Sequence, residues 1–372
     1  MRTRLIAVAA TTVTLAGAGT AWAFGTFDGP NNLAVSGLAY SIELVDIAGD
    51  NQLDVVAAVD GATPNDNVVV FENQGEAGLA AGVPYPAGNG TESVASGHFN
   101  DDSVLDLAVA NYDGQNVSVL MGQPGGGFAA PAPIPGVVPS WIVRVADLDR
   151  DGNDDIVAGN YVIDPLQLSV YLGNGDGTFE NREDYDLGDR PPFALEIGRM
   201  NEDKRPDVVM INEDAELGVF LAKKNGALRE PIVRNIGAQT GGYDVLDLVD
   251  LNGDGKLDVV SSRQHAEQVS TLLGRGDGTL KRHRRFDVEA TTGAITTGLL
   301  DGDKKIDVAV ASEPQTVLFE GKGDGTLKSP RLIGDETPID WLSIDAGKIN
   351  GDKGADLVQG GIDNVGVYLN EP

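Results

Sequence analysis

The sequence predicts an all-β fold built from seven repeated units. A nine-residue segment rich in aspartate recurs at intervals of 49 to 52 residues, and a short apolar strand follows it each time. A fixed period near 50 residues indicates one supersecondary unit repeated along the chain. No stretch shows the 3.6-residue periodicity of an amphipathic helix. The seven segments, called here acidic loops one to seven, begin at Asp46, His98, Asp147, Arg199, Asp250, Leu299 and Lys348.

Each unit contains four candidate strands. The first leads into the acidic loop and the second leaves it, as residues 156–160 (IVAGN) do after the third loop. These second strands are small and β-branched throughout, which is typical of strands buried on both faces. A third strand such as 168–173 (LSVYLG) ends in a Gly-Asp-Gly-Thr turn, a strong hairpin signal. A more variable fourth strand completes the unit.

Seven units of four antiparallel strands predict a seven-bladed β-propeller. Residues 24–372 divide into seven units of about 50 residues without an evident linker, so we expect one domain. The last unit ends after its third strand, whereas the segment from Phe24 resembles the turn and fourth strand of other units. We therefore expect the N-terminal segment to supply the outer strand of the last blade and close the ring.

Residues 1–23 have the pattern of a signal peptide. Arg2 and Arg4 precede an apolar run that is too short to span a membrane, and Ala21-Trp22-Ala23 forms a small-residue cleavage motif. The pattern predicts cleavage after Ala23, secretion and no membrane insertion. The chain has no cysteine, so it forms no disulfide.

The formal net charge of −30 restricts the expected partners. Nucleic acids and acidic lipid surfaces are polyanionic and would be repelled at long range. Divalent cations are favoured instead. The composition contains nothing that requires an oligomer, and we expect a monomer.

The repeated motifs resemble the FG-GAP or VCBS repeat family, which includes the propeller of integrin α subunits. The resemblance rests on three features: the loop D-x-[DN]-x-D-G-x-x-D, complete at 147–155 and 250–258, the small-residue strand that follows it, and the turn G-[NRK]-G-D-G-T-[FL]. It covers residues 24–372 and implies a propeller with calcium-binding loops. It says little about function, because propellers host many activities.

Two acidic loops have the oxygen ligands that calcium prefers. Calcium takes six to eight oxygens, which such a loop offers from side chains at positions 1, 3, 5 and 9 and from the carbonyl at position 7. Carboxylates held this close repel one another unless a cation lies between them. The predicted ligands are Asp147, Asp149, Asp151, Asn153 and Asp155 in the third loop, and Asp250, Asn252, Asp254, Lys256 and Asp258 in the fifth.

The other five loops depart from the calcium pattern. Two are weaker candidates, which would bring the total to four Ca²⁺ sites: Asp46, Asp50 and Asp54 in the first loop, and Asn100, Asp102 and Asp106 in the second. The remaining three carry lysine at position 6, namely Lys204, Lys304 and Lys353. Either this ammonium takes the place of calcium, or it points into solvent and side-chain-to-backbone hydrogen bonds hold the turn.

The face opposite the acidic loops is the expected ligand surface. It would carry the loops that follow the second strands, with Asn111, Tyr112, Asp113, Asn160, Tyr161, Arg263 and His265. An aromatic residue also stands near the start of five first strands: Tyr40, Trp141, Phe193, Tyr243 and Trp341. These rings would form a platform that stacks sugars or peptides, or they would simply fill the space between blades.

The sequence favours a secreted, calcium-stabilised binding or adhesion module for a glycan or an extracellular protein. No catalytic motif with a serine or cysteine nucleophile, no zinc-binding helix motif and no phosphate loop is present. Two alternatives remain: a carbohydrate-active lyase or hydrolase that uses a pair of acids, and a subunit of a larger cell-surface assembly.

Overall fold

The protein was analysed as a computed structural model. It describes residues 26–61, 68–75, 78–136, 138–162, 167–236, 244–263, 267–288, 290–313, 315–333, 343–352 and 354–371. The expected signal peptide, residues 1–23, lies outside this range. The regular elements of the described residues are 27 β-strands. None of these residues belongs to a helix long and apolar enough to cross a membrane.

Five of the sheets contain four antiparallel strands each. The first comprises β5 (Thr91–Gly97), β6 (Asp106–Asn111), β7 (Asn116–Leu120) and β8 (Ala132–Pro133). The second comprises β9 (Ser140–Ala146), β10 (Asp155–Asn160), β11 (Leu168–Tyr171) and β12 (Glu183–Tyr185). The third comprises β13 (Pro192–Gly198), β14 (Asp207–Asn212), β15 (Glu216–Phe220) and β16 (Ile232–Asn235). The fourth comprises β17 (Asp244–Val249), β18 (Asp258–Arg263), β19 (Gln268–Leu272) and β20 (Arg284–Asp287). The fifth comprises β21 (Thr291–Gly298), β22 (Asp307–Glu313), β23 (Thr316–Phe319) and β24 (Arg331–Ile333).

The sixth sheet joins the two ends of the chain. It has seven strands in the order β25 (Ser343–Gly347), β26 (Asp356–Gly360), β27 (Ile362–Glu371), β1 (Thr26–Val45), β2 (Asp54–Asp60), β3 (Val68–Phe71) and β4 (Val83–Tyr85). The first half of β1 pairs with β27, from Thr26 opposite Glu371, and the second half pairs with β2, up to Val45 opposite Asp54. One continuous strand thus serves both groups, whereas the sequence predicted two separate strands.

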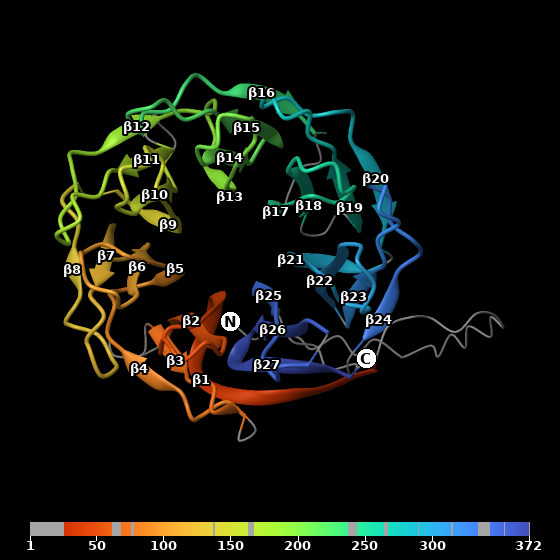
Figure 1. Ribbon diagram of the computed structural model, residues 1–372, viewed down its shortest axis with the longest axis horizontal. Helices are drawn as coiled ribbons and strands as arrows, with labels where there is room; N and C mark the ends of the chain where they lie inside the picture. The colour runs from red at the N-terminus through yellow and green to blue at the C-terminus, as the bar shows by residue number, and fades with distance from the viewer. Residues whose placement is uncertain are drawn as a thin grey trace, which may run out of the picture.

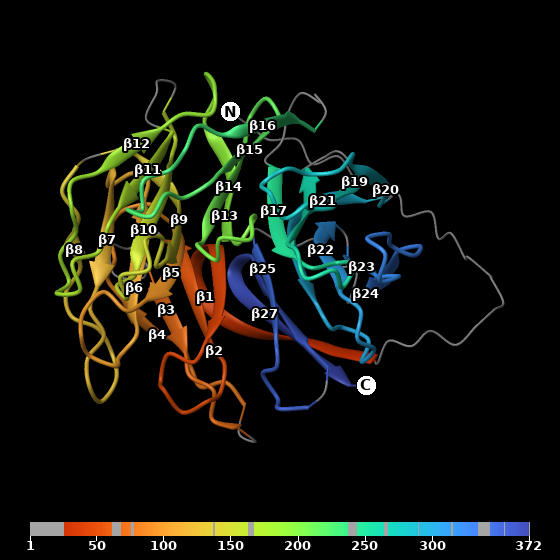
Figure 2. The same cartoon turned by 45° about the horizontal axis from the view of Figure 1, so that its top comes forward.

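The sheets stand around a central axis, with their strands ordered from the inside outwards (Figure 1). In the four-stranded sheets, β5, β9, β13, β17 and β21 lie innermost, and β8, β12, β16, β20 and β24 lie on the outer rim. Figure 2 shows β1 running from the β2 side of its sheet to the C-terminal end. The prediction of repeated four-stranded antiparallel units without helices is confirmed.

The core lies between neighbouring sheets. The second strands are buried along nearly their whole length, as β10 illustrates, because apolar side chains pack on both of their faces. In one cluster, Ile156, Ala158 and Tyr171 of the β9–β12 sheet contact Ala108 and Ala110 of the β5–β8 sheet. Small second-strand residues therefore let adjacent sheets approach closely, as the sequence pattern indicated.

Candidate functional site

The third acidic loop is held in shape by its own carboxylates. Asp147 accepts hydrogen bonds from the backbone N–H groups of Asp151 and Gly152, at 3.1 Å each. Asp149 accepts from Asp151 N–H at 3.1 Å, and Asp151 accepts from Asn153 N–H at 2.8 Å. Gly152 adopts a φ of 98°, so the bend requires the conformation that glycine takes without strain.

This loop brings three carboxylates to one point. Ligand oxygens of Asp147, Asp149 and Asp151 lie within 4.8 Å of one another. Partial burial raises the pKa of Asp149, and the charges of Asp151 and Asp147 raise it further. Each effect disfavours an uncompensated negative charge, so a hard divalent cation bound to all three would relieve both. Because these oxygens already converge, the loop suits calcium.

The fifth loop repeats this backbone pattern with fewer charges. Asp250 accepts from Asp254 N–H at 3.1 Å and from Gly255 N–H at 2.8 Å. Asp254 in turn accepts from Lys256 N–H at 3.0 Å. Asn252 replaces the carboxylate at position 3, and its amide oxygen accepts from Asp254 N–H at 2.9 Å. Two carboxylates and one amide oxygen therefore face the same turn.

The last aspartate of each acidic loop has a separate structural role. In the third loop, Asp155 is 1% exposed and accepts hydrogen bonds from Leu148 N–H at 2.8 Å and Gly173 N–H at 2.9 Å. Burial raises the pKa of Asp155 to about 7, although the two N–H donors oppose the shift. Each oxygen keeps a lone pair, so Asp155 remains a predicted ligand while it joins two strands.

The same arrangement recurs in every loop, and we call these residues the staple aspartates. Each accepts from the backbone N–H at position 2 of its own loop and from a second N–H, which follows the third strand in six loops and belongs to Asn370, near the end of β27, in the seventh. All are at most 1% exposed. They are Asp54, Asp106, Asp155, Asp207, Asp258, Asp307 and Asp356. Loops that lack the calcium pattern share this arrangement, so the aspartate at position 9 stabilises the fold independently of calcium.

The two weaker loops differ from each other. In the first, Asp46 accepts from Asp50 N–H at 2.8 Å and from Asn51 N–H at 2.7 Å, as Asp147 does in the third loop. In the second, Asp102 N–H donates to Asn100 at 2.7 Å, and Asp102 accepts from Val104 N–H at 2.8 Å. The second loop thus lacks the first carboxylate, because histidine stands there.

In two other loops an ion pair forms one position after the lysine for which the sequence left two alternatives open. Lys305 Nζ lies 2.7 Å from Asp303, and an Arg205 guanidinium nitrogen lies 3.0 Å from Asp203. Lys204 and Lys304 form no ion pair with a carboxylate in the described part of the chain. Lys353 lies outside the described residues. Position 7, rather than position 6, therefore carries the compensating charge.

At the opposite end of the sheets, β-bulges interrupt five inner strands. One lies in β21, between Thr292 and Ile295, and in the other four a single residue is extra. The register shifts between Ala39 and Ser41, between Thr91 and Ser93, across Trp141, and between Pro192 and Ala194. The extra residues are Tyr40, Glu92, Trp141 and Phe193. Bulges redirect a side chain out of the ladder and are frequent beside functional sites. Sequence analysis selected three of these four positions and missed Glu92, although alignment of the repeats places Glu92 at the aromatic position.

Four of the predicted ligand residues form one aromatic cluster. The ring centroids of Trp141 and Tyr161 lie 4.9 Å apart, those of Trp141 and Phe193 5.3 Å apart, and those of Tyr112 and Tyr161 5.7 Å apart. The cluster spans three neighbouring sheets, so the rings do fill the space between them. Tyr161 is 41% exposed and the other three are partly exposed. The aromatic residues can therefore both pack between the sheets and offer an exposed surface on which a ligand stacks.

A group of three carboxylates, Asp60, Glu92 and Asp113, adjoins this cluster through Asp113. Asp113 follows Tyr112 directly, and its backbone packs against Gly90 close to the start of β5. Burial raises the pKa of Glu92 to about 7, and the charges of Asp60 and Asp113 raise it further. None of the three forms an ion pair within the described residues. The site therefore combines aromatic rings with uncompensated acids.

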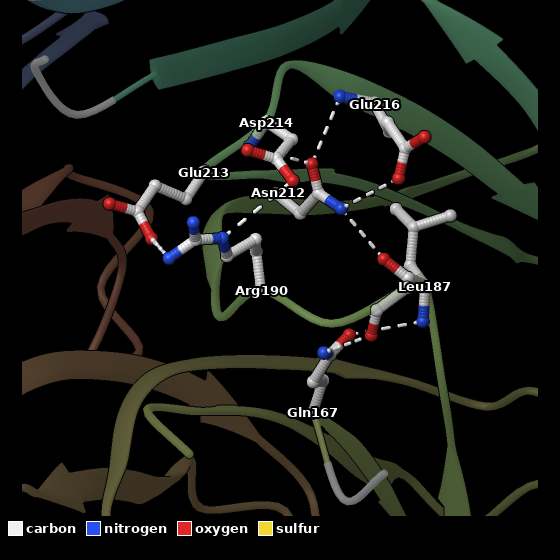
Figure 3. Close-up of polar contacts among 8 residues, drawn as sticks. Gln167, Leu187, Arg190, Asn212, Glu213, Asp214 and Glu216 are labelled. Carbon is white, nitrogen blue, oxygen red and sulfur yellow. Dashed lines mark hydrogen bonds and ion pairs between the residues drawn. The ribbon is translucent and has the colours of Figure 1, made fainter. Parts of the chain in front are cut away.

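A hydrogen-bond network holds the neighbouring loops of this face (Figure 3). The amide nitrogen of Asn212 donates to Leu187 O at 2.7 Å and to Glu216 at 3.1 Å, and its oxygen accepts from Asp214 N–H at 3.1 Å. Arg190 lies 3.4 Å from Glu213 at the edge of the network. Asn111 and Asn160, which we expected on the surface, are fully buried at the equivalent strand ends. These buried side chains support the loops that follow the second strands.

Three of the predicted ligand residues, Tyr243, His265 and Trp341, lie outside the described residues. The backbone of Arg263 ends β18 opposite Asp244, and its side chain is not described.

The family follows from this repeated loop-and-strand unit. A family model described as an FG-GAP-like repeat matches the chain three times, at residues 98–158, 199–261 and 300–358. Each match runs from an acidic loop into the second strand of the next unit. The chain belongs to the FG-GAP-like repeat family. No curated protein matches this FG-GAP-like repeat protein.

Solved structures with low sequence identity share the fold. BBS1N, solved in complex with ARL6DN, has a TM-score of 0.63 at 12% identity, covering 94% of this chain and 98% of that chain. A lectin from Agrocybe aegerita, solved to explain recognition of non-reducing terminal N-acetylglucosamine, has a TM-score of 0.56 at 17% identity, covering 84% and 90%. The Cps50 (Swd1) β-propeller domain from Myceliophteria thermophila has a TM-score of 0.58 at 12% identity, covering 92% and 99%. These similarities establish a propeller fold for the FG-GAP-like repeat protein.

Proposed function

We propose that this FG-GAP-like repeat protein is a binding module that recognises a glycan through its aromatic cluster. The observation that carries the proposal is the contiguous set of Tyr112, Tyr161, Trp141 and Phe193, partly exposed beside Asp113 and Glu92. Aromatic faces stack on the apolar faces of sugar rings, and carboxylates accept hydrogen bonds from sugar hydroxyls. A structural neighbour of similar fold is a lectin, which supports this choice of ligand class.

The test measures glycan binding by single aromatic variants. Tyr161→Ala and Trp141→Ala should each weaken binding of a glycan selected on an array by about 10-fold, or about 1.4 kcal/mol. Tyr85→Ala is the matched control, because Tyr85 lies on the outer strand β4 and pairs with Phe128, which is not part of the aromatic cluster. Loss of thermal stability in Trp141→Ala without loss of glycan binding would refute the proposal, and so would selective capture of a protein ligand by the same residues.

Three further inferences concern calcium binding, closure of the ring and export of the protein. We infer that Ca²⁺ binds the third acidic loop, where three carboxylates converge, and the fifth, which repeats the same turn with Asp250, Asn252 and Asp254. We also infer a seven-bladed ring, in which β1 counts as the outer strand of one blade and the inner strand of the next. The signal-peptide pattern of residues 1–23 supports secretion.

A carbohydrate-active enzyme is the second candidate, because of Glu92. A carboxyl group whose pKa is raised to about 7 can remain protonated at neutral pH and act as a general acid, and Asp113 and Asp60 are carboxylates nearby. Release of reducing ends from an array-positive glycan, abolished in Glu92→Gln, would support an enzyme. Unchanged glycan mass after prolonged incubation would favour simple binding.

A further inference from the structure

The chain carries a concentrated basic surface despite its net charge of −30. Residues 281–285 read Lys-Arg-His-Arg-Arg, four formal cations and a histidine without an acid. Together with two arginines that lie close by, they form a surface that we call the basic rim. Its cations are Arg234, Arg275, Lys281, Arg282, Arg284 and Arg285. It extends over β16 and β20, which lie on the outer rim in Figure 1.

Two arginines of the basic rim converge on a single carbonyl. Arg234 Nη1 and Arg275 Nη1 both donate to Leu280 O, at 2.6 and 2.5 Å. Like charges held this close repel each other, and the carbonyl supplies only a partial negative charge. Each guanidinium also has further N–H donors. An open pocket of about 140 Å³ adjoins this point, lined by Arg234 and Thr279 together with apolar residues of β15 and β16.

The remaining cations are also bound to backbone oxygens or exposed. Arg285 donates to Ile236 O at 3.3 Å, and Arg284 donates to Asp324 O at 3.4 Å in the next sheet. In the part of the chain that the structure describes, none of the six cations forms an ion pair. The aspartates of the two adjacent turns, Asp277 and Asp324, accept hydrogen bonds from Thr279 and Thr326 instead. Asp277 and Asp324 interact electrostatically with Arg275 and Arg284 but form no ion pair with them, so the guanidinium groups of the rim keep donors for a ligand.

Protection of exposed strand edges does not explain this concentration. Natural sheets often place charges on edge strands to prevent edge-to-edge pairing. Here the outer strands β4 and β8 carry no charged residue, β12 carries two acids, Glu183 and Asp184, and β24 carries one arginine, Arg331. A general protective device would recur in every repeat, whereas the cations gather in two neighbouring sheets.

We propose that the basic rim binds an acidic polysaccharide, with one sulfate, carboxylate or phosphate group held between Arg234 and Arg275. The rest of the protein is strongly acidic, so a ligand must place its charges on the rim and keep them away from other surfaces. A flexible polysaccharide can do this, because it can bend the charged groups that do not contact the rim away from the acidic surfaces. Duplex DNA cannot do so as well, because it is stiff and carries a charge about every 1.7 Å. The proposed site is independent of the aromatic cluster.

The experiment compares two triple variants that change the net charge equally. Arg234→Gln/Arg284→Gln/Arg285→Gln should weaken binding of dextran sulfate and of polygalacturonate at least 10-fold, and should reduce the slope of log K against log salt by about two. Arg199→Gln/Lys304→Gln/Lys348→Gln, which removes cations of the acidic loops, should leave both unchanged. Neutral dextran serves as the blank, and single-stranded DNA as the competing polyanion.

His283 provides a readout inside the rim. Its pKa is lowered by burial and by the charges of Arg285, Arg234 and Arg282, so a bound polyanion should raise it, as measured by NMR. The single variant Arg285→Gln should show an intermediate loss of affinity if the triple variant folds poorly. Equal losses in the two triple variants, no dextran sulfate binding at about 50 mM salt, or tighter binding of the DNA would each overturn the proposal.

Discussion

Arg144 on β9 donates two hydrogen bonds to one oxygen of Glu196 on β13, from Nε at 2.8 Å and from Nη2 at 2.6 Å. This ion pair links the inner strands of two neighbouring sheets. Equivalent register positions on other inner strands carry Glu43, Asp247 and Asp345, each opposite the second residue after a staple aspartate. Burial disfavours the charge of Arg144, but Glu196, Glu43 and Asp247 outweigh it and raise its pKa. The positive charge of Arg144 thus offsets the negative charges of several acids on the inner strands.

Removing this cation should destabilise the protein. We expect Arg144→Met to lower the free energy of unfolding by about 2 kcal/mol, less than for a fully buried pair because both side chains are partly accessible, at 32% and 25% exposed. A double-mutant cycle with Glu196→Gln, followed by urea denaturation, should show a coupling energy of about 1 kcal/mol. A coupling energy near zero would mean that the contact contributes no stability.

Asp345 should make stability depend on pH. Burial raises the pKa of Asp345 to about 7, even though Leu44 and Ala346 N–H groups donate to it at 2.9 and 2.8 Å. The folded state therefore holds a proton that the unfolded state loses near pH 4, so the contribution of Asp345 falls as pH rises from about 4 to about 7.

The matched measurement uses Asp345→Asn, whose side chain does not titrate. The stability of the wild type minus that of the variant should decrease between pH 5 and pH 8, as measured by urea denaturation at each pH. This difference cancels titration elsewhere in the chain. A difference that stays constant or rises over this interval would contradict the inferred protonation of Asp345.

Because the staple aspartates stabilise the fold, replacing one should lower the free energy of unfolding strongly even in a loop that lacks the calcium pattern. Asp207→Ala would leave the buried N–H groups of Met200 and Ala222 without their acceptor, at a cost of about 3 kcal/mol. Asp203→Ala in the same loop removes a partly exposed ion pair and should cost less than about 1 kcal/mol. Chemical denaturation should show the same loss for Asp207→Ala with and without chelator. A loss that disappears under chelation would instead assign Asp207 to a metal.

Calcium binding should depend on the carboxylate cluster of the third loop. Asp149→Asn should remove one bound ion from the calorimetric stoichiometry, or weaken that site about 10-fold, because a neutral amide replaces a convergent charge. Asp301→Asn changes the equivalent position of the sixth loop and should leave the stoichiometry unchanged. Calcium should raise the melting temperature of the wild type more than that of Asp149→Asn. Equal effects of both substitutions would contradict our ranking of the loops.

The sequence by itself determined the repeated unit. The second strands, the Gly-Asp-Gly-Thr turns and the bends of the acidic loops depend on local hydrogen bonds and on burial patterns within one unit, so their signals are written in adjacent residues. The pairing of the N-terminal segment with the last strand was also predictable, because each end of the chain lacks the strand that the other supplies.

Only the tertiary structure decided how residues of different units combine. The sequence could not show that Glu92 lies close to Asp113, that Trp141 contacts Tyr161 of its own sheet and Phe193 of the next, or that Arg234 and Arg275 share one carbonyl. It also could not show that the last aspartate of each loop stabilises the fold in addition to being a candidate metal ligand. The reason is geometric, since residues about 50 positions apart meet only when twisted sheets are arranged around a common axis.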